Sequence, residues 1–272
     1  MSRAGQDGPN FEGLFGGTAN PIRMIYMMGA VWRLSRSLPT DNIRILEIGS
    51  WSGASTLTWG EAIQLYFGGH GWITCVDAWQ PFIDLEVNPN ANYREKAAAL
   101  ESGQAYQVFQ GNMRFLPDTV KLEVRRGWSR DVLPSLEAEA YDLVYIDGDH
   151  SYAAVRSDIE ACKSLVRPGG TMSGDDLELQ FQDGMPDIAA DIPGIDEYYD
   201  AERKVRYHPG VSKAVGEAFG PVSAWFGFWA MQKRKDGWEA VDLDGMPIRI
   251  PHHIPPKTII GLKRVLMEAG LI

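Results

Sequence analysis

The sequence is poor in cysteine, with two such residues in a chain of 272. Cys75 and Cys162 both fall inside apolar patterns. Free cysteine in such surroundings usually behaves as a small hydrophobic residue. We therefore expect two buried thiols in a reducing compartment, not a disulfide or a pair of metal ligands.

Basic residues are also in deficit, because 26 Lys and Arg face 36 Asp and Glu, for a formal net charge of −10. Duplex nucleic acid and anionic membranes both demand a positive surface, so neither is expected as a partner. No apolar run approaches the roughly 18 residues that span a bilayer. Residues 1–20 are polar and Gly-rich, without the apolar core of a signal peptide. These absences predict a soluble, cytoplasmic protein.

What the sequence does have is a regular alternation of strand-like and helix-like segments over its first two thirds. We expect strands at 43–48, 72–76, 121–125, 142–146 and 170–174, and helices at 21–37, 53–66, 91–102, 130–136 and 152–166. Such alternation implies parallel strands joined by right-handed crossovers. The predicted fold class is α/β.

The pattern changes after residue 176. Residues 177–208 are irregular, acidic and rich in Tyr and Pro, which indicates a functional lid or a disordered segment. A helix is expected at 210–219, then two strands at 222–232 and 238–243 joined by a turn with Asp-Gly, which predicts an antiparallel hairpin. We expect an N-terminal extension and helix (1–40), a main domain (41–245) and a tail helix (246–272). The tail helix packs on its own domain or, through the terminal helices, on a second subunit of a homo-oligomer.

The turn after the first strand has the sequence Glu47-Ile-Gly-Ser-Trp-Ser-Gly53. Gly49 permits a sharp turn, and Gly53 lets a ligand approach the start of the next helix closely. Asp77 ends the second strand, 24 residues beyond Gly53, where it could accept hydrogen bonds from a ribose. Trp51 stands where a dinucleotide fingerprint needs its second Gly, and would obstruct a pyrophosphate. The turn therefore favours a cationic adenosyl cofactor over NAD.

Two acidic segments follow the fourth and fifth strands, Asp147-Gly-Asp149-His150 and Asp175-Asp176. Carboxyl ends of parallel strands meet at one crevice, where such sheets bind ligands. Clustered carboxylates repel one another unless a cation neutralises them, and an all-oxygen set suits Mg²⁺ or Mn²⁺. The sequence therefore predicts a metal-assisted active site, with Asp149 or His150 as the proton acceptor.

Together these motifs resemble class I S-adenosylmethionine (SAM)-dependent methyltransferases. The glycine-bearing turn followed by an acidic residue carries the general resemblance. The segment 126–134 (Arg-Gly-Trp-Ser-Arg-Asp-Val-Leu-Pro), the Ile-Asp-Gly-Asp motif and the later Pro-Gly-Gly and Asp-Asp are similar to macrocin-type sugar O-methyltransferases. The form Asp-Gly-Asp-His-Ser-Tyr is also common in a related bacterial group. The resemblance covers residues 43–176.

The resemblance implies a Rossmann-like, seven-stranded, mostly parallel sheet with helices on both faces and an antiparallel C-terminal strand. It implies four sets of site residues: Glu47, Gly49, Ser52 and Gly53 for the methionine part of SAM; Asp77 for its ribose; Trp128 and Ser129 for its adenine; and Asp147, Asp175 and Asp176 for the metal. The implied activity is Mg²⁺-assisted methylation of a hydroxyl on a small acceptor such as a sugar, a glycoside or a catechol-like ring. The alternatives are a metal-independent methyltransferase and a non-catalytic SAM-binding scaffold.

Overall fold

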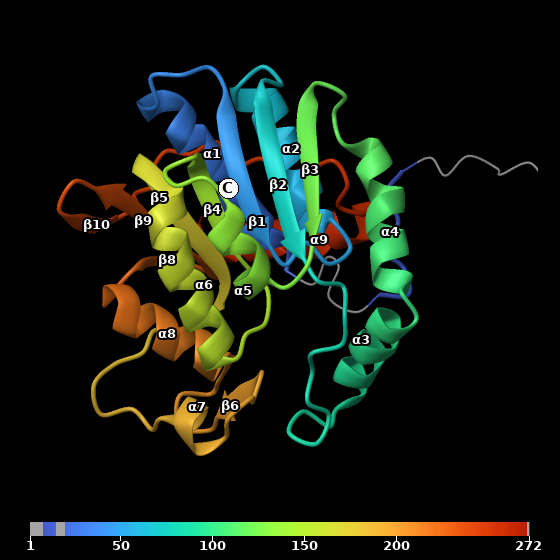
Figure 1. Cartoon of the computed structure of the whole chain (residues 1–272), viewed down its shortest axis with the longest axis vertical. Helices are drawn as coiled ribbons and strands as arrows, with labels where there is room; N and C mark the ends of the chain where they lie inside the picture. The colour runs from blue at the N-terminus through green and yellow to red at the C-terminus, as the bar shows by residue number, and fades with distance from the viewer. Residues whose placement is uncertain (1–7, 15–19, 271) are drawn as a thin grey trace, which may run out of the picture.

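The structure is a computed structural model that describes residues 8–14, 20–270 and 272. Its centre is an eight-stranded sheet with the order β10-β9-β5-β4-β1-β2-β3, in which β8 also pairs with β9 (Figure 1). The strands are β1 Ile43–Ile48, β2 Gly71–Asp77, β3 Val120–Arg126, β4 Tyr141–Ile146, β5 Val166–Leu177, β8 Ser223–Trp225, β9 Gly227–Arg234 and β10 Gly237–Ala240.

Strands β1 to β5 are parallel, and β9 runs antiparallel to β5. This confirms the expected Rossmann-like sheet with an antiparallel C-terminal strand. The count is eight instead of seven because β8 and β10 follow each other along the outer edge of β9. β1 pairs with β2 on one side and with β4 on the other, so the strand order reverses there. Ligands bind outside the carboxyl ends of the strands at such a switch point.

Helices cover both faces of the sheet (Figure 1). α5 (Ser129–Val132), α6 (Tyr152–Leu165) and α8 (Pro209–Phe219) lie on one face, and α1 (Pro21–Ser37), α2 (Ala54–Tyr66) and α9 (Pro256–Glu268) lie on the other. Alternate residues of β1 serve the two cores: Ile43 and Ile45 pack with α1 and α2, while Leu46 and Ile48 pack with α6. The period of two in the strand thus builds two apolar layers.

Sequence reasoning missed the helix α4 (Gln104–Asn112). α3 (Ala91–Glu101) and α4 are separate, because Gly103 lies between them in the left-handed conformation, with φ 73°. The side chain of Asn112, at the end of α4, accepts from the Asn10 amide and donates to the Asn10 carbonyl. It also donates to the carbonyl of Ser52. Residues 8–14 are therefore attached to the domain, while residues 1–7 and 15–19 of the N-terminal extension lie outside the described part of the chain.

Residues 177–208 have more structure than their composition indicates. They contain α7 (Ile188–Asp191) and a hairpin of β6 (Tyr198–Asp200) with β7 (Val205–Tyr207). We refer to residues 177–208 as the insertion. It lies beyond the carboxyl ends of the central strands, in the lower part of Figure 1.

The tail helix α9 buries Leu262 and Leu266 in the core that α1 and α2 share. Its opposite face leaves Ile260 and Met267 exposed. The tail therefore packs on its own domain, and association of two chains stays a prediction. No helix in the described part of the chain combines the length and apolarity needed to span a bilayer.

Candidate active site

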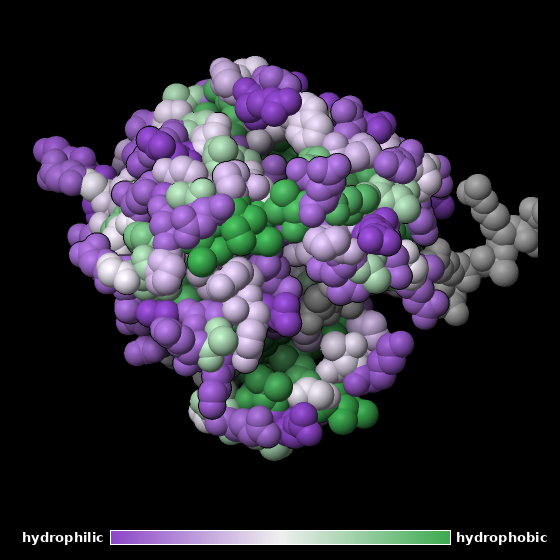
Figure 2. Space-filling view, turned by 90° about the horizontal axis from the view of Figure 1, so that it is seen from below, coloured by the Kyte–Doolittle hydropathy of each residue, from purple (hydrophilic) through white to green (hydrophobic). Residues whose placement is uncertain are grey.

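A cavity of about 420 Å³ opens at the carboxyl ends of the central strands. That size suits a small-molecule ligand, for which cavities of about 300–1,000 Å³ are usual. Figure 2 views the molecule from this side and shows a hollowed face. The lining comes from the first turn, the ends of β2, β4 and β5, and from α1, α3 and the insertion. The sequence-predicted site residues in this lining are Gly49, Ser52, Asp77, Trp128, Ser129, Asp147, Asp149, His150, Asp175 and Asp176.

The first turn needs its glycines. Gly49 has φ 85°, and a Cβ there would collide with the carbonyl of Asp147. Gly53 caps α2 with φ 87° and packs against Met113 and Phe109 instead of lining the cavity. Ser52 does line it, and its Oγ is buried with no hydrogen-bond partner among the described residues. A buried polar atom of this kind usually has a hydrogen-bond partner, and a ligand in the cavity would supply one.

Glu47 has a different place from the one predicted. Its side chain is fully buried and does not line the cavity. It accepts hydrogen bonds from Ser50 Oγ at 2.8 Å, Trp59 Nε1 at 3.1 Å and the Thr56 hydroxyl. Burial raises the pKa of this carboxyl, although the donors oppose the shift. Glu47 therefore fixes the turn onto α2 and does not reach the cavity.

Asp77 braces the turn from the end of β2. Its two oxygens accept from the backbone N–H of Trp51 at 2.9 Å and of Trp79 at 2.7 Å. Both tryptophans have positive φ, so this carboxylate holds two uncommon backbone conformations. Each oxygen has a second lone pair, which leaves Asp77 able to accept from a ribose as well. Burial raises its pKa, against the effect of the two backbone bonds.

The third-strand turn forms the next wall. Trp128 precedes α5 and Ser129 begins it, and both line the cavity. Ser129 bonds to Asp158 on α6, a buried carboxyl that also lines the cavity. Burial raises the pKa of Asp158 to about 6. Sequence reasoning missed Asp158, because one acidic residue within a helical pattern gives no sign of burial.

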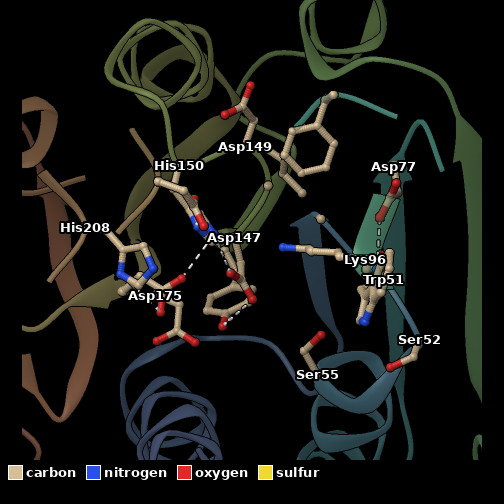
Figure 3. Close-up of a pocket in the computed structure, with 18 of the residues that line it drawn as sticks. Trp51, Ser52, Ser55, Asp77, Lys96, Asp147, Asp149, His150, Asp175 and His208 are labelled. Atoms are coloured by element: carbon tan, nitrogen blue, oxygen red, sulfur yellow. Dashed lines mark hydrogen bonds and ion pairs between the residues drawn. The ribbon is translucent and has the colours of Figure 1, made fainter. Parts of the chain in front are cut away.

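His150 is the central titratable group of the opposite half of the cavity. Its Nε2 lies 3.0 Å from Asp176 Oδ2 and 3.6 Å from Asp147 Oδ1, and its Nδ1 lies 2.8 Å from Asp196 Oδ1. Asp149 instead accepts from the Ser151 amide, and in Figure 3 its carboxylate points away from Asp175 and His208. The structure thus brings His150, Asp147 and Asp176 together and leaves Asp149 apart.

Asp175 and Asp176 lie on an irregular part of β5. The register with β9 shifts between Gly174 and Leu177, and Asp176 has φ 62°, a conformation that Asp tolerates better than most residues. Gly174 faces the indole of Trp229, which occupies the space of a side chain there. This packing accounts for a glycine before the aspartate pair.

An arginine from α1 neutralises these carboxylates. Arg23 Nη1 lies 2.9 Å from Asp175 Oδ1 and also pairs with Asp176, while Nη2 pairs with Glu178. Its Nε donates to the carbonyl of Phe226 at 2.8 Å. Burial opposes the charge, but the three carboxylates outweigh it and raise the pKa of Arg23. The arginine is therefore a permanent cation within the acidic cluster.

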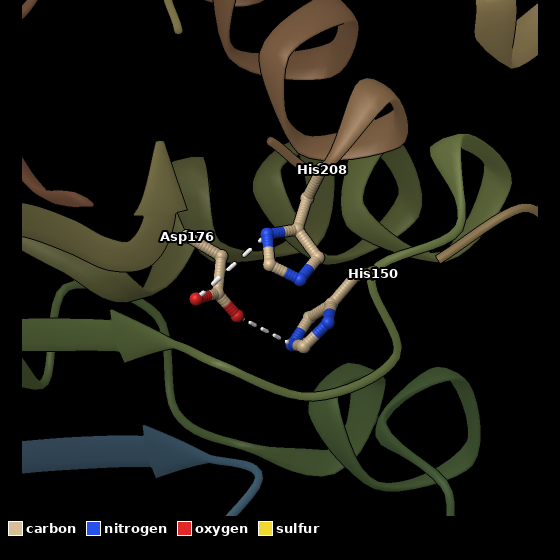
Figure 4. Close-up of side chains that lie close together, drawn as sticks. All are labelled: His150, Asp176 and His208. Atoms are coloured by element: carbon tan, nitrogen blue, oxygen red, sulfur yellow. Dashed lines mark ion pairs between the residues drawn. The ribbon is translucent and has the colours of Figure 1, made fainter. Parts of the chain in front are cut away.

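His208, just before α8, completes the cluster. Its ring lies 4.9 Å from that of His150, and its Nδ1 lies 3.2 Å from Glu178 Oε2. Figure 4 shows both imidazoles turned toward the carboxylate of Asp176. From the sequence, His208 at the end of the insertion could either reach the site or stay solvated in the loop. Sequence reasoning missed Arg23 and Asp196, which no local pattern connects to His150.

The charges set the titration of the cluster. Burial by itself would lower the pKa of His150, but the charges of Asp196 and Asp176 outweigh it and raise that pKa well above 6.5. Burial likewise opposes ionisation of Asp196, yet the charge of His150 holds its pKa well below the usual range. The pKa of Asp175 is about 7, because burial and the neighbouring Asp176 and Asp147 outweigh the effect of Arg23.

The predicted magnesium ligands do not fit that ion as they stand, because Arg23 already neutralises Asp175 and Asp176. In the described part of the chain, the group of three ligands whose atoms lie within 4.8 Å of one another is His150, Asp176 and His208 (Figure 4). A set with two imidazoles suits zinc or iron better than magnesium. The metal ligands therefore stay a prediction.

The residues of the other half do fit an adenosyl cofactor. The start of α2 presents backbone N–H groups, Ser52 Oγ lacks a partner, and Asp77 retains accepting capacity. Lys96 on α3 points into the cavity between the two halves, with its Nζ 5.7 Å from the ring of Trp51 (Figure 3). These groups can hold a nucleoside that carries an amino acid.

A Rossmann-like sheet with such a pocket at its switch point is the arrangement that the resemblance to class I SAM-dependent methyltransferases implied. Residues 46–177 match a family described as "Methyltransferase domain", so this part of the chain is a methyltransferase domain.

The chain is similar to several solved structures. The chain is similar to the O-methyltransferase NovP, with 16% identity over 79% of this chain and 81% of that one, and a TM-score of 0.52. It is similar to the calicheamicin methyltransferase CalS11, with 15% identity over 78% and 79% and a TM-score of 0.48. For cofactor-bound Rv0187 from MTB the identity is 22%, over 57% of this chain and 54% of that one, with a TM-score of 0.33. No curated protein matches the chain.

Proposed function

We propose that the protein methylates a hydroxyl group of a small, polyhydroxylated acceptor, with SAM as the donor. The observation that carries this proposal is the position of His150. It lies in the same cavity as the glycine-bearing turn, and carboxylates flank it on both sides. A pocket that unites a nucleoside-binding turn with a titratable base has the parts that methylation of a hydroxyl requires.

The donor half would hold the cofactor. Ser52 and the first amides of α2 would bind the methionine carboxylate, because a helix N-terminus favours negative charge. Asp77 would accept from the ribose hydroxyls, and Trp128 and Ser129 would border the adenine. When bound, SAM supplies a methyl group on a positively charged sulfur. The acidic lining of the cavity favours that charge.

In the other half, His150 would accept the proton of the acceptor hydroxyl at Nε2. A base held in position contributes about a hundredfold to ten-thousandfold in rate. Asp147 and Asp176 flank this nitrogen and stabilise the imidazolium that forms. Asp149, the other predicted base, is less well placed, because it points away and accepts from a backbone amide.

Arg23 would take the part that a divalent ion was expected to play. It keeps Asp175 and Asp176 from repelling each other and fixes them at the cavity wall. We therefore propose methyl transfer without a metal, and no step here requires one. Chelation with EDTA should leave the activity intact. Loss of activity in EDTA, with recovery when Mg²⁺ is added, would instead support the predicted magnesium site at Asp147, Asp175 and Asp176.

The insertion favours a polyhydroxylated acceptor over an aromatic one. None of the insertion's tyrosine or phenylalanine residues lines the cavity. Phe181 packs against α8 at Gly216, and Tyr198 pairs with Tyr207. What the insertion contributes is polar: Glu178, Asp196, Glu197 and His208. Carboxylates and imidazoles bind hydroxyl groups, so a sugar or glycoside fits this wall better than a catechol-like ring.

Two measurements test the proposal. Isothermal titration with S-adenosylhomocysteine (SAH) should show one site, and SAM with a panel of sugars, glycosides and catechols should release SAH for a sugar or glycoside. Absence of SAH binding would refute the cofactor assignment. Binding without turnover on any acceptor would instead favour a non-catalytic SAM-binding protein.

A further inference from the structure

Asp196 contacts the proposed base from the insertion. It lies 46 residues from His150 in the chain, and its Oδ1 is 2.8 Å from His150 Nδ1. Its side chain is 17% exposed, so the contact is largely shielded from water. A carboxylate on Nδ1 fixes the orientation of an imidazole, which is how many catalytic histidines are held.

The main chain of Asp196 is itself fixed by Asn88. Asn88 Oδ1 accepts from the Asp196 amide at 2.9 Å, and Asn88 Nδ2 donates to Gly194 O at 2.9 Å. The same Nδ2 donates to Asp84 O at 3.1 Å, and Asn88 is only 4% exposed. One buried amide thus ties the insertion to the loop between β2 and α3.

That loop and α3 also form the wall of the donor half. Gln80, Phe82 and Asn90 line the cavity, as does Lys96, whose ammonium lies over the rings of Phe82 and Trp51. Tyr93 of α3 hydrogen-bonds to Asp196. The residues that place Asp196 therefore belong to the wall against which the cofactor would lie.

We propose that Asp196 is a positioning residue that the insertion brings to His150, and that Asn88 makes this placement depend on the cofactor wall. The inference rests on the proposed function, since it names how the base of that reaction is held. The proposal predicts that docking of the insertion and orientation of the His150 ring occur together. The insertion is thereby assigned a second task beyond lining the cavity with polar side chains.

The groups that face His150 come from four places. They are Asp147 at the end of β4, Asp176 on β5, Asp196 in the insertion and His208 before α8. Removing the charge of Asp196 leaves Asp147 and Asp176 in place, so the imidazole loses one of several partners. Its titration midpoint should therefore move to lower pH without returning fully to that of a free histidine.

The first experiment compares Asp196→Asn with Asp183→Asn, the same change at an exposed position of the same insertion. The Hε1 resonance of His150, assigned with a His150→Gln variant, is titrated by NMR with SAH bound. We expect the titration midpoint of His150 to fall in Asp196→Asn only. The SAH affinity of this variant should stay within about twofold of wild type, and its melting temperature within about a few degrees. An unchanged midpoint would overturn the proposal.

A second variant separates positioning from folding. Asp196→Glu keeps the charge, so its His150 midpoint should stay nearer to wild type than that of Asp196→Asn. If Asp196→Asn and Asp196→Glu lower the midpoint equally, Asp196 has a general structural role and the proposal fails. These readouts need no acceptor, so they remain valid even if the acceptor class is wrong.

Asn88 is tested through the insertion itself, which offers trypsin Arg203, Lys204 and Arg206. In Asn88→Ala the insertion should be cut at least about tenfold faster than in wild type or in Asn42→Ala, an exposed control, since opening becomes easier by more than 1.4 kcal/mol. Added SAH should slow the cutting of wild type and have less effect on Asn88→Ala. Equal cutting rates would contradict the link. Absence of SAH binding to wild type would instead refute the proposed function.

Discussion

Among single residues, Glu47 shows how a correct motif can carry a different role. Its place before the glycine turn predicts contact with the cofactor, yet its carboxyl lies in the core and receives donors from Ser50, Thr56 and Trp59. Sequence reasoning cannot separate these roles, because they depend on which way a strand-end side chain turns. The donors on α2 decide that direction.

Replacing Glu47 tests this role. Glu47→Ala would leave the Thr56 and Trp59 donors buried without partners and should lower the free energy of unfolding by about 3 kcal/mol. Glu47→Gln keeps an acceptor in nearly the same volume and should cost much less. Urea denaturation measures both. Equal losses for Ala and Gln would show that the acceptor oxygen does not hold the turn.

Arg23 could not have been assigned to the site from the sequence, because 153 residues separate it from Asp176. The one local signal is a charged residue between Ile22 and Met24, both buried. Removal of the Arg23 side chain should let the site bind a divalent ion, as the sequence prediction requires. Freed of the guanidinium, Asp147, Asp175 and Asp176 would repel one another and attract a divalent ion.

The corresponding variant is Arg23→Met, which keeps the length of the side chain and removes its charge. We expect the rate of methyl transfer to fall about tenfold or more and to recover in part when Mg²⁺ is added. The rate of the wild type should not respond to Mg²⁺. SAH release in EDTA and in Mg²⁺ measures both effects. A wild type that needs Mg²⁺ and a variant that does not respond to it would together contradict the role of Arg23.

At the scale of elements, the alternation of strands and helices predicted the central sheet well. The apolar periods of β1, β2, β4 and α6 are strong, and their bounds agree with the structure within one or two residues. Each miss has a physical cause. α4 is short and begins after Gly103, and the irregularity in β5 depends on packing of Gly174 against Trp229, which is distant in sequence.

Two glycines give a matched test of that packing. Gly174→Ala should lower the free energy of unfolding by about 1–3 kcal/mol, since its Cβ would meet the Trp229 ring and the carbonyl of Ile146. Gly111→Ala, in α4 with nothing within 4 Å of the new Cβ, should raise it by up to about 1 kcal/mol. Chemical denaturation measures both. A tolerated Gly174→Ala would show that the β5 irregularity does not require glycine.

At the scale of the whole molecule, the site is a balance of charge gathered from distant elements. Sequence reasoning identified the strand-end carboxylates and His150, because parallel strands deliver their ends to one edge. It could not find the partners from α1, α3 and the insertion, because a helix or loop that crosses this edge has no register with the strands. Arg23, Lys96 and Asp196 all belong to this group.

The charge balance predicts the pH dependence of the reaction. The pKa of His150 is raised well above 6.5, so the imidazole stays protonated at neutral pH and is free to accept a proton only at higher pH. The ratio kcat/KM should therefore rise with pH through a midpoint above 6.5. The ion pairs of His150 stabilise the fold below pH 6.5, and this contribution is lost as pH rises through its folded pKa. A rate independent of pH from about 6 to 9 would argue against His150 as the base.

The most direct test of the central claim is a crystal structure of the protein grown with SAH and Mg²⁺. We expect the ribose against Asp77, the adenine beside Trp128, and the guanidinium of Arg23 still between Asp175 and Asp176. A nucleoside bound elsewhere would contradict the cofactor pocket. A magnesium ion held by Asp147, Asp175 and Asp176, with Arg23 displaced, would contradict methyl transfer without a metal.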